Sequence, residues 1–121
     1  MKAVFDSDVL IDYLLGLPKA RTELQKYEQR LVSVVSWTEV MIGAKNSEES
    51  RRCRDFLASF TLIPFDQAIA EEAVLLRQTR NIKLPDAIIW ATARTSDALL
   101  VTRNTKDFPK ADPFVRFPYQ L

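Results

Sequence analysis

Short apolar runs alternate along the chain with longer stretches in which apolar residues recur every three or four positions. The short runs are typical of buried strands and the longer stretches are typical of helices. We expect strands at residues 3–5, 31–35, 61–65 and 98–102, and helices at residues 9–15, 19–30, 36–43, 47–60, 66–80 and 84–93. The tail at residues 113–121 alternates aromatic residues with proline and is expected to add an edge strand.

The order of these elements predicts the fold class. Strands separated by helices, with apolar residues on both faces of each strand, are typical of a parallel sheet covered on both sides. A chain of 121 residues with 47% hydrophobic content is long enough to bury one core. We therefore predict a single α/β domain over residues 1–121, with a mostly parallel sheet of four to five strands and helices on both faces.

Composition narrows the possible chemistry. The chain has no histidine and one cysteine, Cys53, which excludes His-based nucleophile pairs, disulfides within the chain and the usual zinc sites. Its net charge of +1 gives no overall attraction to nucleic acid. Asp6, Asp8 and Asp12 interrupt the N-terminal apolar run, and no later run approaches the ~20 residues that span a bilayer. We expect a soluble, cytoplasmic protein without membrane contact.

Four acidic residues occupy comparable positions next to the predicted strands and helices. Asp6 follows the first strand, Glu39 lies in the first turn after the second, Asp86 begins a helix, and Asp107 comes just after the fourth strand. Ligands of open parallel sheets bind beyond the carboxyl ends of the strands, so these four side chains are candidates for one site.

Each acid also has a structural interpretation. Ser36 and Glu39 fit a capping box, Asp86 fits a helix N-cap or first turn, and Asp8 fits a cap of the first helix. Asn104 with Asp107 fits a second capping box. Asp6 is the hardest to explain in this way, because Asp8 is already placed to cap.

Several carboxylates in one cleft repel one another, and a divalent cation removes that penalty. Oxygen ligands without histidine or paired thiolates favour Mg²⁺ or Mn²⁺ over zinc. Such an ion can activate water and stabilise the leaving oxygen of a phosphodiester. The residues themselves therefore point to phosphoryl transfer to water.

The motifs FDSDVLIDYL, SWTEVMIGA, LPDAIIWATA and LVTRNTKDF, in this order and at fitting spacing, resemble the PIN-domain ribonucleases, especially the VapC-type toxins of toxin–antitoxin pairs. The resemblance implies a metal-dependent endoribonuclease whose catalytic and metal-binding acids are Asp6, Glu39, Asp86 and Asp107, with Asn104 as an alternative fourth member. It also implies supporting hydroxyls at Ser7 and Thr102. Asp8 stands where the family more often has Asn or Ser, either as a further ligand or as a cap.

The same resemblance implies an RNA substrate, a small antitoxin that covers the cleft, and a homodimer. Arg103, Lys106 and Arg94 are candidate phosphate contacts. Trp37 and Trp90 lie on apolar helical faces and are expected to pack in the core. The helix at residues 9–15 is apolar nearly all round, which independently predicts a surface that is covered by a partner.

Two other functions fit parts of the chain. Asp6-Ser7-Asp8 copies the acid-x-acid signature of aspartyl-phosphate phosphatases, although Val9-Leu10 replaces the expected Gly-Thr. A non-catalytic binding module would use the acids only as helix caps.

Overall fold

Five strands form one sheet in the order β3-β2-β1-β4-β5, and every neighbouring pair is parallel. The computed structural model describes all 121 residues. The strands are β1 (Lys2–Phe5), β2 (Gln29–Ser33), β3 (Thr61–Ile63), β4 (Leu99–Val101) and β5 (Val115–Arg116). The parallel α/β sheet and the edge strand from the tail are thus confirmed.

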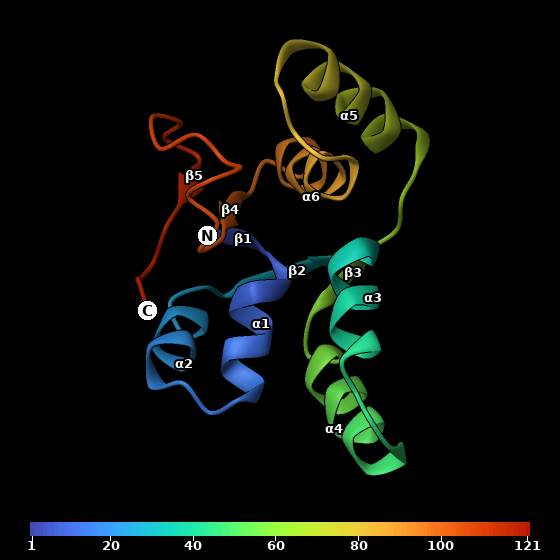
Figure 1. Ribbon diagram of the computed structural model, residues 1–121, viewed down its shortest axis with the longest axis vertical. Helices are drawn as coiled ribbons and strands as arrows, with labels where there is room; N and C mark the ends of the chain where they lie inside the picture. The colour runs from blue at the N-terminus through green and yellow to red at the C-terminus, as the bar shows by residue number, and fades with distance from the viewer.

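Six helices cover the two faces of the sheet. They are α1 (Ser7–Leu14), α2 (Pro18–Leu24), α3 (Val34–Ile42), α4 (Ser47–Leu57), α5 (Gln67–Thr79) and α6 (Leu84–Thr95). Figure 1 shows α5 and α6 on one side of the sheet and α1 to α4 on the other. None of these helices is both long enough and apolar enough to cross a membrane.

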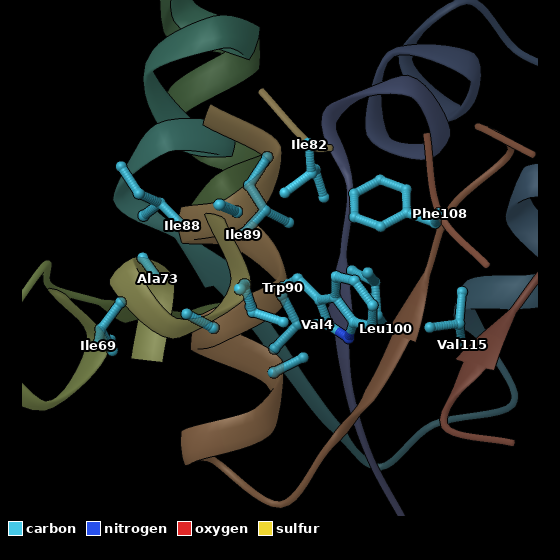
Figure 2. Close-up of a cluster of buried hydrophobic side chains, with 14 of the residues drawn as sticks. Val4, Ile69, Ala73, Ile82, Ile88, Ile89, Trp90, Leu100, Phe108 and Val115 are labelled. Atoms are coloured by element: carbon cyan, nitrogen blue, oxygen red, sulfur yellow. The ribbon is translucent and has the colours of Figure 1, made fainter. Parts of the chain in front are cut away.

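The strands are apolar on both faces because each face packs on its own core. Val4 and Leu100 point into a cluster of 16 buried residues beneath α5 and α6, which includes Trp90 and Phe108 (Figure 2). Phe5 and Val101, their neighbours in the chain, belong to a second cluster of 13 buried residues beneath the helices of the other face. This alternation follows from the two-residue period of a strand.

Several helix boundaries differ from the prediction. Helix α1 begins two residues early, at Ser7, α4 ends at Leu57 and α6 extends to Thr95. The predicted helix at residues 19–30 is the shorter α2, and β2 starts at Gln29. Helix α3 begins two residues earlier than expected, because Ser33 caps it by accepting a hydrogen bond from the Ser36 amide at 3.1 Å. Val34 and Val35 favour a strand by their β-branched side chains, but the cap places them in the first turn of the helix.

Strand β1 lies in the middle of the sheet and marks its topological switch point. The chain passes from β1 to β2 and β3 on one side, and it returns to β4 and β5 on the other. The connections leave the carboxyl ends of β1 and β4 in opposite directions, and open parallel sheets bind their ligands at such a point. Asp6 and Thr102, the residues after these two strands, lie at this place.

Candidate active site

Asp6 is fixed between the two central strands. Its Oδ1 accepts a hydrogen bond from the Ser7 amide at 2.8 Å, and its Oδ2 accepts one from the Thr102 hydroxyl at 2.8 Å. Its own amide donates to the Val101 carbonyl at 2.9 Å. The side chain is 6% exposed, and this burial raises the pKa of the carboxyl group, which the two hydrogen bonds only partly oppose.

Asp8 joins helix α1 to the loop after β4. Its Oδ1 accepts a hydrogen bond from the Val9 amide at 2.7 Å and its Oδ2 accepts one from the Arg103 amide at 3.1 Å. Burial and, next, the charge of Asp6 raise its pKa to about 7. The prediction that Asp8 caps α1 is wrong, since Asp6 occupies the N-cap position and Asp8 lies inside the first turn.

Glu39 has no capping role. Because Ser33 is the N-cap of α3, the predicted capping box between Ser36 and Glu39 does not form, and Glu39 lies well inside the helix. Ser36 is instead buried one turn before Glu39, and its hydroxyl has no hydrogen-bond partner. Partial burial raises the pKa of Glu39, the nearby Ser7 hydroxyl lowers it, and the charge of Asp6 raises it further. Glu39 is therefore close enough to Asp6 to interact with its charge.

Asp86 lies in the first turn of α6, as predicted, while Lys83 occupies the N-cap position without a side-chain bond. Burial raises the pKa of Asp86 to about 6, and three acids add to this effect, in the order Asp6, Asp107 and Glu39. The charge of Lys83 lowers it. Asp86 thus interacts with the charges of the other three predicted acids, although the four come from separate parts of the chain.

Asp107 and Asn104 form the predicted reciprocal pair. The Asn104 Nδ2 donates to Asp107 Oδ2 at 2.9 Å, and the Asp107 amide donates to Asn104 Oδ1 at 3.1 Å. The Asn104 amide donates to the Thr102 hydroxyl oxygen at 3.0 Å. Thr102 is fully buried and also bonds Asp6, so one chain of hydrogen bonds runs from Asp6 to Asp107.

The structure changes the interpretation of two of the arginines. The guanidinium of Arg103 binds both carboxylate oxygens of Asp12, with Nε–Oδ2 at 2.6 Å and Nη2–Oδ1 at 3.1 Å, so it is not a free phosphate contact. Arg94 pairs with Glu72 at 2.8 Å, in the last turn of α6 and far along the helix from Asp86. Of the three predicted phosphate contacts, Lys106 is the one whose position still fits this role, because it is exposed and lies beside Asp107.

Sequence reasoning missed the buried Asp12 and Tyr119, whose hydroxyl donates to Asp12 Oδ2 at 2.8 Å. A single polar residue in an otherwise apolar helix was the available signal. The expected packing of the tryptophans is confirmed: Trp90 is 1% exposed and Trp37 packs against the second core cluster. A hollow of about 330 Å³ at the far end of α6 is lined by Trp90, Arg94 and five other residues and contains none of the four acids.

The acids at this edge have the chemistry of a divalent cation site. Asp6 is buried, Asp86 and Asp107 are half-buried, Glu39 is exposed, and the charges of the other three act on Asp86; no histidine or thiolate accompanies them. As the side chains stand, no three of them are close enough to enclose an ion. The residues present fit Mg²⁺ or Mn²⁺ by ligand type, since both ions prefer oxygen ligands and commonly use only one or two carboxylates.

Comparison with known proteins identifies the family. The PIN domain family matches residues 3–112. Ribonuclease VapC10 of Mycobacterium tuberculosis is 39% identical over 112 residues, which cover 86% of this chain and 84% of that protein. A chain of a toxin–antitoxin complex from Klebsiella pneumoniae superposes with a TM-score of 0.92 at 44% identity, covering 98% and 99% of the two chains. FitAcB from Neisseria gonorrhoeae shares the fold at 22% identity, with a TM-score of 0.81 and coverage of 98% and 99%. This chain belongs to the PIN domain family, in the group of the VapC ribonucleases.

Proposed function

We propose that this protein is the toxin of a toxin–antitoxin pair and that it hydrolyses RNA phosphodiester bonds with Mg²⁺ or Mn²⁺. The ligands of the ion would come from Asp6, Glu39, Asp86 and Asp107. One observation carries the proposal: the charges of Asp6, Asp107 and Glu39, which come from three other parts of the chain, all raise the pKa of Asp86. The ribonuclease name of the Mycobacterium tuberculosis relative supports the reaction.

The interpretation of the acids as mere helix caps is weakened by the contacts of Glu39 and Asp8. Neither caps its helix, and both interact with Asp6. If these acids only capped helices, the repulsion between their charges would destabilise the fold and no function would offset that cost. A functional site explains why the repulsion is kept.

The residues of the chain position the reacting groups. Thr102 and the Ser7 amide fix the carboxylate of Asp6, and the pairing with Asn104 fixes that of Asp107. A bound divalent ion would lower the pKa of a water molecule and stabilise negative charge on the phosphate. The raised pKa values of Asp86, about 6, and of Asp8, about 7, allow both groups to exchange a proton near neutral pH in the free protein.

The RNA backbone requires cations at the edge of the site. Lys106 beside Asp107 and Lys83 at the start of α6 are exposed and form no ion pair, so they are free to contact phosphate. Lys83 is close enough to Asp86 to lower its pKa. These two lysines replace Arg103 and Arg94 as the proposed phosphate contacts.

Exposed apolar residues support both proposed protein partners. On α1 and the end of α3, Ile11, Leu15 and Ile42 are 37%, 79% and 76% exposed, and we assign this face to the antitoxin. On α5, Val74 and Leu75 are 52% and 56% exposed, and we assign them to a second copy of the chain. The Klebsiella pneumoniae neighbour is described as a toxin–antitoxin complex, which supports an antitoxin partner.

The phosphatase alternative is not favoured. The signature requires Gly-Thr after its second acid, whereas this chain has Val9-Leu10 there, within α1.

The test is RNA cleavage by the purified chain. We expect cleavage with Mg²⁺ or Mn²⁺, none with EDTA, and none by Asp6→Asn. Asp55→Asn, which removes the same charge from the exposed face of α4, is the matched control and is expected to cleave at the wild-type rate. Equal cleavage by Asp6→Asn, or cleavage that persists in EDTA, would overturn the proposal.

A further inference from the structure

Two buried carboxylates in this protein each bind one arginine and one tyrosine, and Glu23 also pairs with Lys26 at 3.2 Å. Asp12 binds the guanidinium of Arg103 through both oxygens and accepts a bond from the Tyr119 hydroxyl at 2.8 Å. Glu23 binds the guanidinium of Arg116 through both oxygens, at 2.5 and 3.0 Å, and accepts a bond from the Tyr27 hydroxyl at 2.8 Å. The two carboxylates are 7% and 2% exposed.

The first of these triads, Asp12–Arg103–Tyr119, is joined to the candidate active site. Arg103 follows Thr102, and its amide donates to Asp8 at 3.1 Å. Thr102 bonds Asp6, and Asn104 bonds both Thr102 and Asp107. The guanidinium of Arg103 is the side chain that fastens this loop to the middle of α1.

Tyr119 brings the end of the chain into the same network. It lies beyond residues 3–112, which are the part that matches the PIN domain family. The tail runs from β5 toward α2 (Figure 1), and Tyr119 packs against the core cluster on that face while its hydroxyl reaches Asp12. The second triad, Glu23–Arg116–Tyr27, anchors the tail as well, but its side chains contact none of the site residues.

We propose that Asp12, Arg103 and Tyr119 are positioning residues of the active site. They hold the loop at residues 102–107 against α1, and through it the carboxylates of Asp6, Asp8 and Asp107. Tyr119 is thereby the residue of the C-terminal tail that is joined to the site. The inference rests on the proposed function, and it deepens it by assigning Arg103 a role toward the metal ligands and not toward RNA.

The geometry explains why Arg103 acts through Asp12. A bidentate pair of arginine and carboxylate fixes both direction and distance, whereas a lysine would contribute a point charge only. Outer residues that orient metal ligands typically change metal affinity about 10- to 100-fold when they are altered. Arg103→Lys keeps the charge and the main-chain amide but loses the fork, so we expect it to weaken metal binding about 10-fold.

The experiment compares the two triads. Mn²⁺ binding is measured by electron paramagnetic resonance for Arg103→Lys and Tyr119→Phe and for the matched controls Arg116→Lys and Tyr27→Phe. The two arginine variants each lose a guanidinium group, and the two tyrosine variants each lose a hydroxyl group. The Arg116 carbonyl also accepts a bond from the Thr102 amide at 3.1 Å, and Arg116→Lys keeps the main-chain atoms that form it. Urea unfolding and RNA kcat and KM are measured on the same samples.

We expect Arg103→Lys to weaken Mn²⁺ binding about 10-fold and Tyr119→Phe to weaken it roughly threefold, and both variants should have a lower kcat. Both controls should bind Mn²⁺ like wild type although they lose a similar amount of stability. If Mn²⁺ binding were weakened equally in all four variants, the first triad would have only a structural role, and the inference would be overturned. Unchanged Mn²⁺ affinity with a higher KM for RNA in Arg103→Lys would also overturn it, because Arg103 would then contact phosphate. If Arg103→Lys does not fold, Tyr119→Phe decides alone, since it removes one oxygen atom.

Failure of this inference is distinguishable from failure of the proposed function. Wild-type protein that binds Mn²⁺ but cleaves no RNA would contradict the nuclease proposal and leave the comparison of the triads valid. Wild-type protein that cleaves RNA and binds Mn²⁺, with both first-triad variants unchanged, would overturn the positioning role alone. Wild-type protein that binds no Mn²⁺ would overturn both.

Discussion

Replacing Asp86 by asparagine is predicted to stabilise the fold while removing the activity. Asp86 is held near three other acids, and its pKa is raised from 3.8 to about 6. This rise corresponds to about 3 kcal/mol of preference for the uncharged form. Asp86 is only partly buried, so solvent screening reduces the stabilisation expected from removing its charge to about 1.5 kcal/mol. The charge is also attracted to the N-terminus of α6, and losing this attraction costs about 0.5 kcal/mol. We expect Asp86→Asn to raise the free energy of unfolding by about 1 kcal/mol at pH 7.5.

The pH dependence of this gain follows from the direction of the pKa shift. Because the folded state raises the pKa of Asp86, folding favours its protonated form, and the wild type loses stability as the pH rises from about 4 through about 6. Below the ordinary value of 3.8, aspartic acid and asparagine are both uncharged. The advantage of the variant therefore disappears at low pH and is complete above about pH 6.

The assay is urea unfolding in EDTA at several pH values, with Glu48→Gln as the control. Glu48 is also a first-turn acid, on α4, but it is exposed and lies outside the cluster, so its replacement is expected to cost about 0.3 kcal/mol. Added Mg²⁺ should stabilise the wild type and leave Asp86→Asn unchanged. A variant that is no more stable than wild type at pH 7.5, or a gain that persists at pH 4, would refute the reasoning.

Three further predictions concern the metal, the fourth acid and the core. Mn²⁺ affinity should rise between about pH 5 and pH 8, because Asp86 and Asp8, with pKa values of about 6 and about 7, lose their protons in this range. A Mn²⁺ affinity that does not change with pH in paramagnetic resonance titrations would contradict this prediction. Asn104→Ala should lower RNA cleavage about 10-fold by releasing Asp107, while Asp107→Asn abolishes it; the opposite order would make Asn104 the fourth member of the site. Trp90→Ala should lower the free energy of unfolding by about 3–5 kcal/mol in urea, and Trp37→Ala, which is less buried, should cost clearly less.

The sheet and the positions of the four acids could be predicted because their signals are local. Apolar runs such as Ala3–Phe5 and the acids directly after them are read from neighbouring residues. A parallel sheet then brings the carboxyl ends of its strands to one edge, together with the first turns of the helices that lead to the next strand. This is why Asp6, Asp86 and Asp107 were predicted to lie near one another.

The start of α3 was predicted wrongly because two serines compete for the same role. Ser33 and Ser36 each stand before a helical stretch, and the valines between them favour a strand. The hydrogen bond from the Ser36 amide to Ser33 settles the choice. It also removes the capping interpretation of Glu39, whose interaction with Asp6 depends on where the helix begins.

The triad around Asp12 could not be predicted because its members are far apart in the sequence. Arg103 lies 91 positions after Asp12, and Tyr119 lies 107 positions after it. A lone aspartate in an apolar helix indicates that a partner is needed, but nothing local identifies that partner. Arg103 was therefore assigned to phosphate on its neighbourhood alone, whereas the fold directs its side chain to α1.

The central claim, that the four acids form one metal site, is tested most directly by diffraction from crystals grown or soaked with Mn²⁺. Anomalous difference density should show a peak at the carboxyl edge of the sheet, in contact with Asp6 and with at least one of Glu39, Asp86 and Asp107. A map without a peak at this edge, or with peaks only elsewhere, such as beside Asp97 and Asp112 in the hollow at the far end of α6, would contradict the account.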